Sequence, residues 1–280
     1  MTEDVDSRTL ATRDLLNSLA SRRNFLRVGA TITAAGAGIA AFPTLAAAAG
    51  TGTSPDSVQT ILDIARTAEQ LAVTFYTNGI RNADELGLTR SEVVYLKAAL
   101  IEEQIHQTFF TTNGGKSLVD TFSFPRGEAT FSDLGTFIAT QQQLEGVFDS
   151  AFLCAVREFA EMSPNQARLA QISAQIALIE SEHRVLGRDI AASHRINVLP
   201  APSAGQSTEP ADNWAYAPVI LTSVGQAPSV VAAAGYFSPV EDNSYKYVQV
   251  NFDGTGEDEL GLQAVASKIL YKDGPFSARP

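Results

Sequence analysis

The sequence contains one arrangement of acidic residues and histidine twice. In each copy a lone glutamate is followed, 34 or 35 positions later, by a Glu-x-x-His segment. The two copies are Glu69, Glu103 and His106, and Glu145, Glu180 and His183. A glutamate and a histidine three positions apart lie on the same face of a helix, about one turn apart, so both can reach one ion. The doubled arrangement therefore predicts a site for two metal ions between four helices.

The chemistry of these side chains supports a metal site. Four carboxylates buried together would repel one another and lose hydration, so their pKa values would rise until they became protonated. Two divalent cations would supply about four positive charges and remove this penalty. Carboxylate oxygens and imidazole nitrogens suit iron or manganese better than a metal that prefers thiolates. Most helical glutamates face water, but the chain has only three histidines and two of them occupy matching positions, which favours the ligand interpretation.

Apolar residues that recur every three or four positions predict two helices before residue 115. The first is expected over about 55–77, with Ser54 as its N-cap and Asn78-Gly79 as its end. The second follows Thr89, which stands at capping-box spacing from Glu92. Together they describe a helical hairpin with a short turn.

A second pair of helices follows a longer connection at 114–131. One is expected from 132–133 to about 161, and the other, capped by Ser163-Pro164, to about 193. The two copies of the ligand pattern are offset by 76 and 77 positions, which indicates a duplicated hairpin. Two hairpins joined by one long connection predict a four-helix bundle with one crossover.

The remainder of the chain has a different composition. Residues 199–212 are rich in Pro, Ala, Ser and Gly and are expected to form a linker. Beyond it we expect short helices within 217–234, a short strand within 245–252 and a last helix within 258–270, all packed on the bundle. The predicted organisation is a signal peptide at 1–49, a bundle at 54–196 and a linker with a C-terminal extension at 197–280.

The N-terminus is similar to a twin-arginine export signal. Arg22 and Arg23 precede Phe25-Leu26, a weakly apolar run at 28–45 and four alanines at 46–49. A transmembrane anchor is the alternative, but a run diluted by Gly, Ala and Thr is marginal for spanning a bilayer. We therefore expect cleavage near 46–49, no stable membrane span afterwards, and a periplasmic or extracellular location. The twin-arginine machinery moves folded proteins, so metals would be acquired before export.

Charge and composition exclude other classes of protein. The chain has 31 acidic and 20 basic residues, a net charge of −11, which disfavours a nucleic-acid partner. Hydrophobic residues make up 45% of it, so disorder throughout is excluded. Cys154 is the only cysteine, so no intramolecular disulfide can form.

Residues 55 to 195 resemble the ferritin-like superfamily, because the repeated pattern matches its ligand set without substitution. The export signal and apolar tail resemble a bacterial branch of it that is related to plant desiccation-induced proteins. The resemblance implies an all-α bundle with one long crossover that holds two iron ions or, alternatively, two manganese ions. Glu103 and Glu180 would bridge both ions. The pairs that would complete the two sites are Glu69 with His106 and Glu145 with His183.

Tyr76 is the one candidate catalytic residue. It follows Glu69 by seven positions, two turns along the same helical face. In ferritin and rubrerythrin relatives a tyrosine at this offset lies beside the metals, where it can hydrogen-bond a ligand or supply an electron. The equivalent residue of the second half is Phe152, which can do neither, and a core role for Tyr76 is the alternative.

Three other residues have a supporting or surface role in this interpretation. Glu102 and Glu182 adjoin ligands but point about a third of a turn away, toward a supporting position or solvent. His194 is expected to cap the fourth helix or interact with its dipole.

Three functions from different classes fit these expectations. The first is a di-iron oxidase or ferroxidase that reacts ferrous iron with dioxygen or peroxide, in oxidative or desiccation stress; a manganese form would disproportionate peroxide instead. The second is iron sequestration, which needs a hollow oligomer. The third is a structural stress protein without enzymatic activity. The sequence leaves the oligomeric state and the electron partner open.

Overall fold

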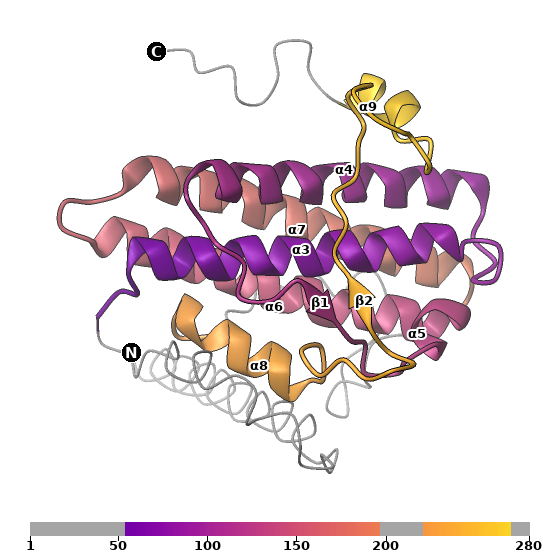
Figure 1. The fold of residues 1–280 in the computed structure, drawn as a ribbon, viewed down its shortest axis with the longest axis horizontal. Helices are drawn as coiled ribbons and strands as arrows, with labels where there is room; N and C mark the ends of the chain where they lie inside the picture. The colour runs from indigo at the N-terminus through magenta and orange to yellow at the C-terminus, as the bar shows by residue number, and fades with distance from the viewer. Residues whose placement is uncertain (1–53, 197–220, 270–280) are drawn as a thin grey trace, which may run out of the picture.

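Four long helices dominate the computed structural model, which describes residues 54–196 and 221–269 (Figure 1). The first hairpin consists of α3 (Val58–Arg81) and α4 (Arg90–Thr112), and the second of α6 (Leu134–Glu161) and α7 (Ala167–Ser193). The connection between the hairpins contains β1 (Thr121–Phe122) and α5 (Ala129–Ser132). This arrangement confirms the predicted all-α four-helix bundle with one long crossover.

The capping box at Thr89 is the one that the sequence predicts, and a second cap lies at the predicted start of its helix. Thr89 and Glu92 form a reciprocal capping box: the Thr89 N–H donates to Glu92 Oε2 at 2.7 Å, and the Glu92 N–H donates to Thr89 Oγ1 at 3.3 Å. Asp133 caps α6 by accepting a hydrogen bond from the Thr136 N–H at 2.7 Å. Side chains thus satisfy N–H groups that have no partner within their own helix.

The expected start and end of the first helix are both wrong. Its N-cap is Ser57, whose hydroxyl accepts from the Thr60 N–H at 3.1 Å, and the helix ends at Arg81 rather than at Asn78-Gly79. Gly79 lies inside the helix and packs against the ring of Phe137, where a Cβ atom would overlap the ring. The glycine allows a close approach between two helices and does not mark a helix end.

The expected cap of the fourth helix is also wrong. The helix begins at Ala167 with Gln166 as its N-cap, two residues after Pro164. The Gln166 N–H donates to the Phe159 carbonyl at 2.9 Å, which places Gln166 at the end of the turn from α6.

The C-terminal extension packs on the bundle. It contains η2 (Val224–Gln226), α8 (Ala227–Ala233), β2 (Tyr245–Lys246) and α9 (Gln263–Ile269). In Figure 1, α8 lies along the bundle and the chain then crosses α3 and α4 to reach α9. The two strands pair antiparallel, with Thr121 opposite Lys246. The tail and the crossover connection therefore support each other on the outside of the bundle.

Hydrogen bonds fix the start of this extension to the end of the bundle. Glu158 on α6 accepts from the N–H groups of Asp56 and Val224, each at 2.8 Å. Asp56 in turn accepts from the Gly225 N–H at 2.6 Å. Two acidic side chains thus satisfy three backbone N–H groups where η2 meets α3 and α6.

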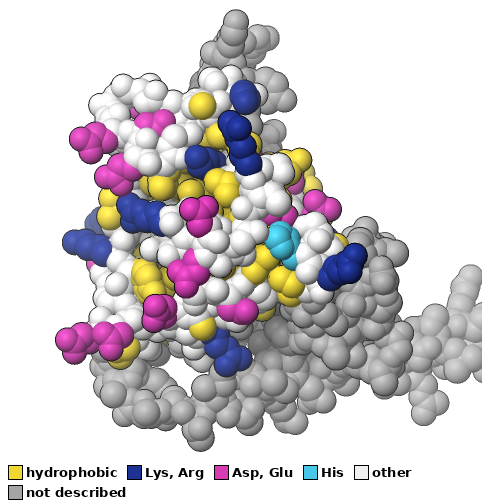
Figure 2. Space-filling model, turned by 90° about the vertical axis from the view of Figure 1, so that its right-hand side faces the viewer, with side chains coloured by type: hydrophobic (Ala, Val, Ile, Leu, Met, Phe, Trp, Pro, Cys, Tyr) yellow, Lys and Arg dark blue, Asp and Glu magenta, His cyan; other side chains and the backbone are white. Residues whose placement is uncertain are grey.

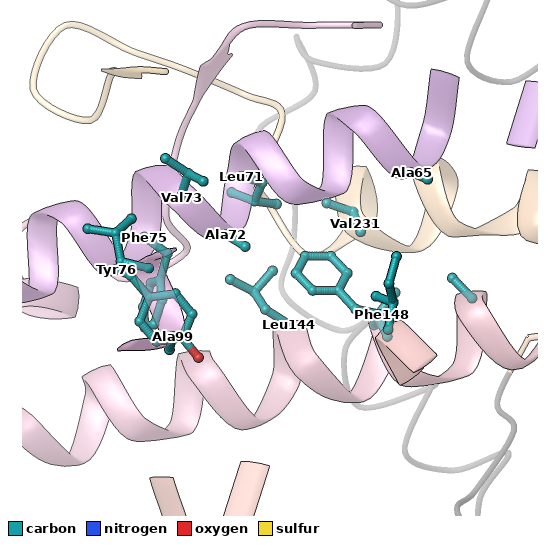
Figure 3. Packing of buried hydrophobic residues seen from close by; sticks show 14 of the residues in the cluster. Ala65, Leu71, Ala72, Val73, Phe75, Tyr76, Ala99, Leu144, Phe148 and Val231 are labelled. Atoms are coloured by element: carbon teal, nitrogen blue, oxygen red, sulfur yellow. The ribbon is translucent and has the colours of Figure 1, made fainter. Parts of the chain in front are cut away.

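Aromatic and aliphatic side chains fill the space between the helices (Figure 3). Phe75 stacks on Phe137 with ring centroids 4.6 Å apart, and Tyr76 is fully buried. Figure 3 shows Leu144 and Phe148 of α6 on the side that faces α3. Packing of this kind is the main stabilising contribution in a helical bundle.

The surface carries charges of both signs. Figure 2 shows the face at the right of Figure 1, where acidic and basic side chains are interspersed around small hydrophobic areas. Within residues 54–196 and 221–269, none of the helices combines the length and the apolarity needed to cross a membrane. The predicted export signal at 1–49 and the linker at 199–212 lie outside the described residues.

Candidate metal centre

The two copies of the sequence pattern meet in the interior of the bundle. The structure brings together two groups of side chains whose candidate ligand atoms lie within 4.8 Å of one another. The first group is Glu69, Glu103, His106 and Glu180, and the second is Glu103, Glu145, Glu180 and His183. Glu103 and Glu180 belong to both groups. Each of the four long helices contributes at least one of these residues.

In both groups the Nδ1 atom of a histidine faces the carboxylates. His106 Nδ1 lies 3.6 Å from Glu69 Oε2 and 3.7 Å from Glu180 Oε1. His183 Nδ1 lies 3.0 Å from Glu103 Oε1 and 3.3 Å from Glu180 Oε2. The shared carboxylates therefore stand between the two imidazoles, as the bridging assignment requires.

Most of these ligand atoms lack a well-formed hydrogen bond. Among the described residues, both oxygens of Glu69, Glu103 and Glu180, one oxygen of Glu145 and the Nδ1 atoms of both histidines are buried without such a partner. Buried polar atoms normally have partners, and leaving a charged one without any is costly. A pair of cations at the centre of the cluster would satisfy all of them, so the residues present fit a di-metal site.

The electrostatics of the cluster require a counter-charge. Burial, together with the charge of Glu103, raises the pKa of both Glu69 and Glu180 well above its usual value. For His183, burial alone would lower the pKa, but the charge of Glu145 and the hydrogen bonds to Glu102 and Glu103 outweigh this effect and raise it well above its usual value. The raised pKa values favour protonation of these side chains when no metal is bound, and a metal ion would displace those protons.

Two polar side chains hold His183 in position. Glu102 accepts a hydrogen bond from His183 Nε2 at 2.9 Å, and its own side chain is 33% exposed. Gln141 Nε2 donates to the His183 carbonyl at 2.9 Å. A ring partner such as Glu102 fixes the tautomer and the ring orientation of a ligating histidine, whereas Gln141 holds its backbone. Glu102 was expected either to support a ligand or to face solvent, and it supports His183. Gln141, which stands one turn before Glu145, was not predicted from the sequence.

Tyr76 lies directly beside the cluster. Its hydroxyl donates a short hydrogen bond to Glu145 Oε1 and accepts one from Gln141 Nε2 at 3.0 Å. Burial and the charge of Glu145 raise the pKa of Tyr76 well above its usual value, so the phenol keeps its proton. Phe152, the equivalent residue of the second half, stacks on Phe110 with ring centroids 5.9 Å apart. The two halves of the bundle therefore differ at this position.

The remaining acidic and histidine candidates lie outside the cluster. Glu182 is exposed. His194 is the C-cap of α7, and its Nε2 lies 3.1 Å from Glu92 at the start of α4. It thus joins the ends of two helices, in agreement with its expected capping role.

Comparison with known proteins identifies the domain that carries the cluster. The chain has no significant match among curated proteins or among solved structures. The family model of the ferritin-like domain matches residues 57–192, a range that contains all six clustered side chains. Residues 57–192 of this chain therefore form a ferritin-like domain.

Proposed function

We propose that the protein is an exported di-iron oxidase that oxidises ferrous iron with dioxygen or peroxide, in oxidative or desiccation stress. The observation that carries this proposal is the sharing of Glu103 and Glu180 between two ligand groups. A site for a single ion needs no shared carboxylates, whereas two adjacent ions use them as bridges. Oxygen and imidazole donors favour iron or manganese.

Each residue of the cluster has a role in holding the metals. Glu69 with His106 would complete one site, and Glu145 with His183 the other, with Glu103 and Glu180 between them. When bound, a pair of iron ions supplies two electrons for the reduction of dioxygen or peroxide. Oxidation of two ferrous ions by dioxygen consumes two protons and gives hydrogen peroxide, and oxidation by peroxide consumes two protons and gives two water molecules.

The surrounding side chains control protons and water. Glu102 accepts a hydrogen bond from His183 Nε2, which would leave the Nδ1 lone pair free for a metal ion once that ion has displaced any proton there. Tyr76 donates its hydroxyl proton in a hydrogen bond to Glu145 and so places a proton donor beside the cluster. Phe148, three positions after Glu145 on α6, is buried and would limit the access of water on that side.

Metal content is the first test. The protein is purified from cells in which it folds before export, and its metals are counted per chain. Two iron ions per chain with oxygen-dependent ferrous oxidation is the expected result. Two manganese ions with oxygen evolution from peroxide would replace the iron assignment by a manganese catalase-like activity, to which the same donor set is suited. Absence of bound metal would reject both.

Histidine variants separate a metal-dependent function from a structural one. His106→Ala and His183→Ala each remove a ligand, whereas His194→Ala removes the histidine that lies outside the cluster. We expect metal content and ferrous oxidation to fall in the first two variants and to persist in the third. Full protection of cells from oxidative or desiccation stress by the two metal-free variants would favour a structural protein. A hollow oligomer in solution would favour sequestration.

Export has its own test. Replacing both Arg22 and Arg23 by lysine keeps the positive charge but removes the paired arginines of the signal. We expect this variant to accumulate inside the cell with its metals bound. Unchanged export would contradict the twin-arginine assignment while leaving the metal assignment intact.

A further inference from the structure

A small apolar cavity of about 30 Å³ lies inside the described part of the bundle, near the candidate metal centre. All four long helices contribute to its wall, through Ala65, Phe110, Phe148 and Ser173 among others. The C-terminal extension forms part of its outer wall with Val224, Ala227 and Val231. Figure 3 shows Ala65, Phe148 and Val231 around this region.

The position of the cavity follows from the spacing of its residues. Phe148 stands three positions after Glu145, Ala65 four before Glu69, and Phe110 four after His106. Because the two helices of each hairpin run in opposite directions, these offsets all lead toward the same end of the bundle. At about 1.5 Å per residue, the cavity begins roughly 5 Å along the bundle axis from the ligands.

The lining of the cavity disfavours water. Apart from Thr67 and Ser173, every lining side chain is apolar. The Thr67 hydroxyl is already engaged, since it donates to the Asp63 carbonyl at 2.7 Å and accepts from the Leu118 N–H at 2.9 Å. A buried water molecule needs about two to four polar partners, and one serine hydroxyl does not supply them.

The size of the cavity selects a very small occupant. A volume of 30 Å³ exceeds the roughly 10–15 Å³ that one water-sized sphere needs, and it is far below the roughly 150 Å³ of an apolar cavity that holds benzene. A diatomic apolar gas fits both the volume and the lining. Hydrogen peroxide fits the volume, but it would lose its hydrogen bonds to water on entry.

We propose that this cavity binds dioxygen and supplies it to the metal centre, and that the C-terminal extension serves to close it. The inference rests on the proposed function and names dioxygen, rather than peroxide, as the oxidant. It also assigns a role to η2 and α8, which carry none of the clustered ligands. Their attachment through Glu158 and Asp56 then keeps the outer wall of the cavity in place.

Variants that fill the cavity test this proposal. Ala151→Val and Ala65→Val each add two methyl groups at its wall. Ala191→Val is the matched control, because Ala191 is a buried helical alanine that does not line the cavity. Two independent filling variants guard against the failure of one of them to fold, which circular dichroism detects.

The first measurement uses xenon as a probe for a small apolar gas. In crystals of the full chain under xenon pressure, we expect an anomalous peak in the cavity of the wild type and of Ala191→Val. The peak should be lost in the filling variants. A wild-type cavity without xenon would overturn the proposal, whatever the activity of the protein.

The second measurement uses the metal-loaded protein with dioxygen or hydrogen peroxide as the oxidant. We expect filling to raise KM for dioxygen by about fivefold or more, because the gas loses its dispersion contacts, with kcat and the peroxide-driven rate unchanged. An unchanged KM for dioxygen would overturn the supply role even if xenon binds. If the wild type oxidises no ferrous iron with either oxidant, the proposed function fails, and the supply role fails with it. Binding of xenon then decides only whether the cavity takes up gas.

Discussion

Tyr76 donates a hydrogen bond to Glu145 across the bundle, from the first helical hairpin to the second. The same hydroxyl accepts a hydrogen bond from Gln141, so three helices are connected through one phenol and the neighbouring His183 carbonyl. Sequence spacing places Tyr76 on the face of Glu69, but its actual partner belongs to the other copy of the repeat. The asymmetry between Tyr76 and Phe152 therefore gives the two candidate metal sites different surroundings.

Tyr76→Phe tests whether this phenol acts on the cluster or only fills the core. The variant keeps the ring and removes the hydroxyl, which leaves Gln141 without one acceptor and Glu145 without one donor. We expect the free energy of unfolding to fall by about 1–2 kcal/mol in thermal or urea denaturation. Two metals per chain should remain, and ferrous oxidation should slow. Unchanged oxidation with only a stability loss would assign Tyr76 to the core.

Glu102→Ala tests the support of His183. Without the carboxylate at 2.9 Å, the imidazole loses the group that keeps the proton on Nε2. Loss of such a partner costs about 10- to 100-fold in metal affinity, which competition with a chelator measures. Glu102→Gln should recover part of the affinity, because an amide oxygen still accepts the hydrogen bond. Glu182→Ala removes an exposed glutamate beside the same histidine and should leave the affinity unchanged; an equal loss in both variants would contradict the positioning role.

Local patterns predicted those parts of the fold and the cluster that depend on one helix at a time. The capping box at Thr89 and the two Glu-x-x-His segments each lie within about one turn of a single helix, and their spacing in the sequence reveals them. The role of Gln141 depends on how three helices are placed along one another, and the spacing of residues in the sequence does not reveal this placement. The cavity likewise requires the C-terminal extension to fold back on α3 and α6. What the sequence left open is therefore the packing between distant segments.

The pH dependence of stability should show the contribution of Glu92. Burial favours the neutral form of Glu92, but hydrogen bonds from Thr89, His194 and Ser193 outweigh it and lower its pKa to about 2. An unfolded glutamate has a pKa of roughly 4.3, so the folded state holds the charged form more strongly. The resulting stabilisation is fully present above about pH 5 and is lost as the pH falls toward 2.

Glu92→Gln should remove this contribution. In urea unfolding of the chelator-treated protein, we expect the free energy of unfolding of the wild type to exceed that of the variant by about 2–3 kcal/mol at pH 6. This difference should shrink as the pH falls from about 4.5 to about 2.5. Glu161→Gln is the control, because its side chain is 55% exposed at the end of α6. A difference between wild type and Glu92→Gln that does not change with pH would show that the charge of Glu92 is not the stabilising feature.

Gly79→Ala should show that Gly79 is required by packing between helices. A Cβ atom at this position would overlap the ring of Phe137, which is fully buried and stacked on Phe75 and therefore cannot move freely. We expect a loss of about 1–3 kcal/mol in the free energy of unfolding, the usual cost of overpacking a core. Gly146→Ala is the matched control, because Gly146 is also helical and its added Cβ would have no neighbour nearer than the Arg184 guanidinium at 3.9 Å. Here alanine should stabilise the helix by about 0.5–1 kcal/mol, since it restricts the unfolded chain. If the free energy of unfolding falls in Gly79→Ala and rises in Gly146→Ala, the contact with Phe137 is the cause of the loss. Equal stabilisation by both substitutions would mean that the two helices can separate at Gly79 without cost.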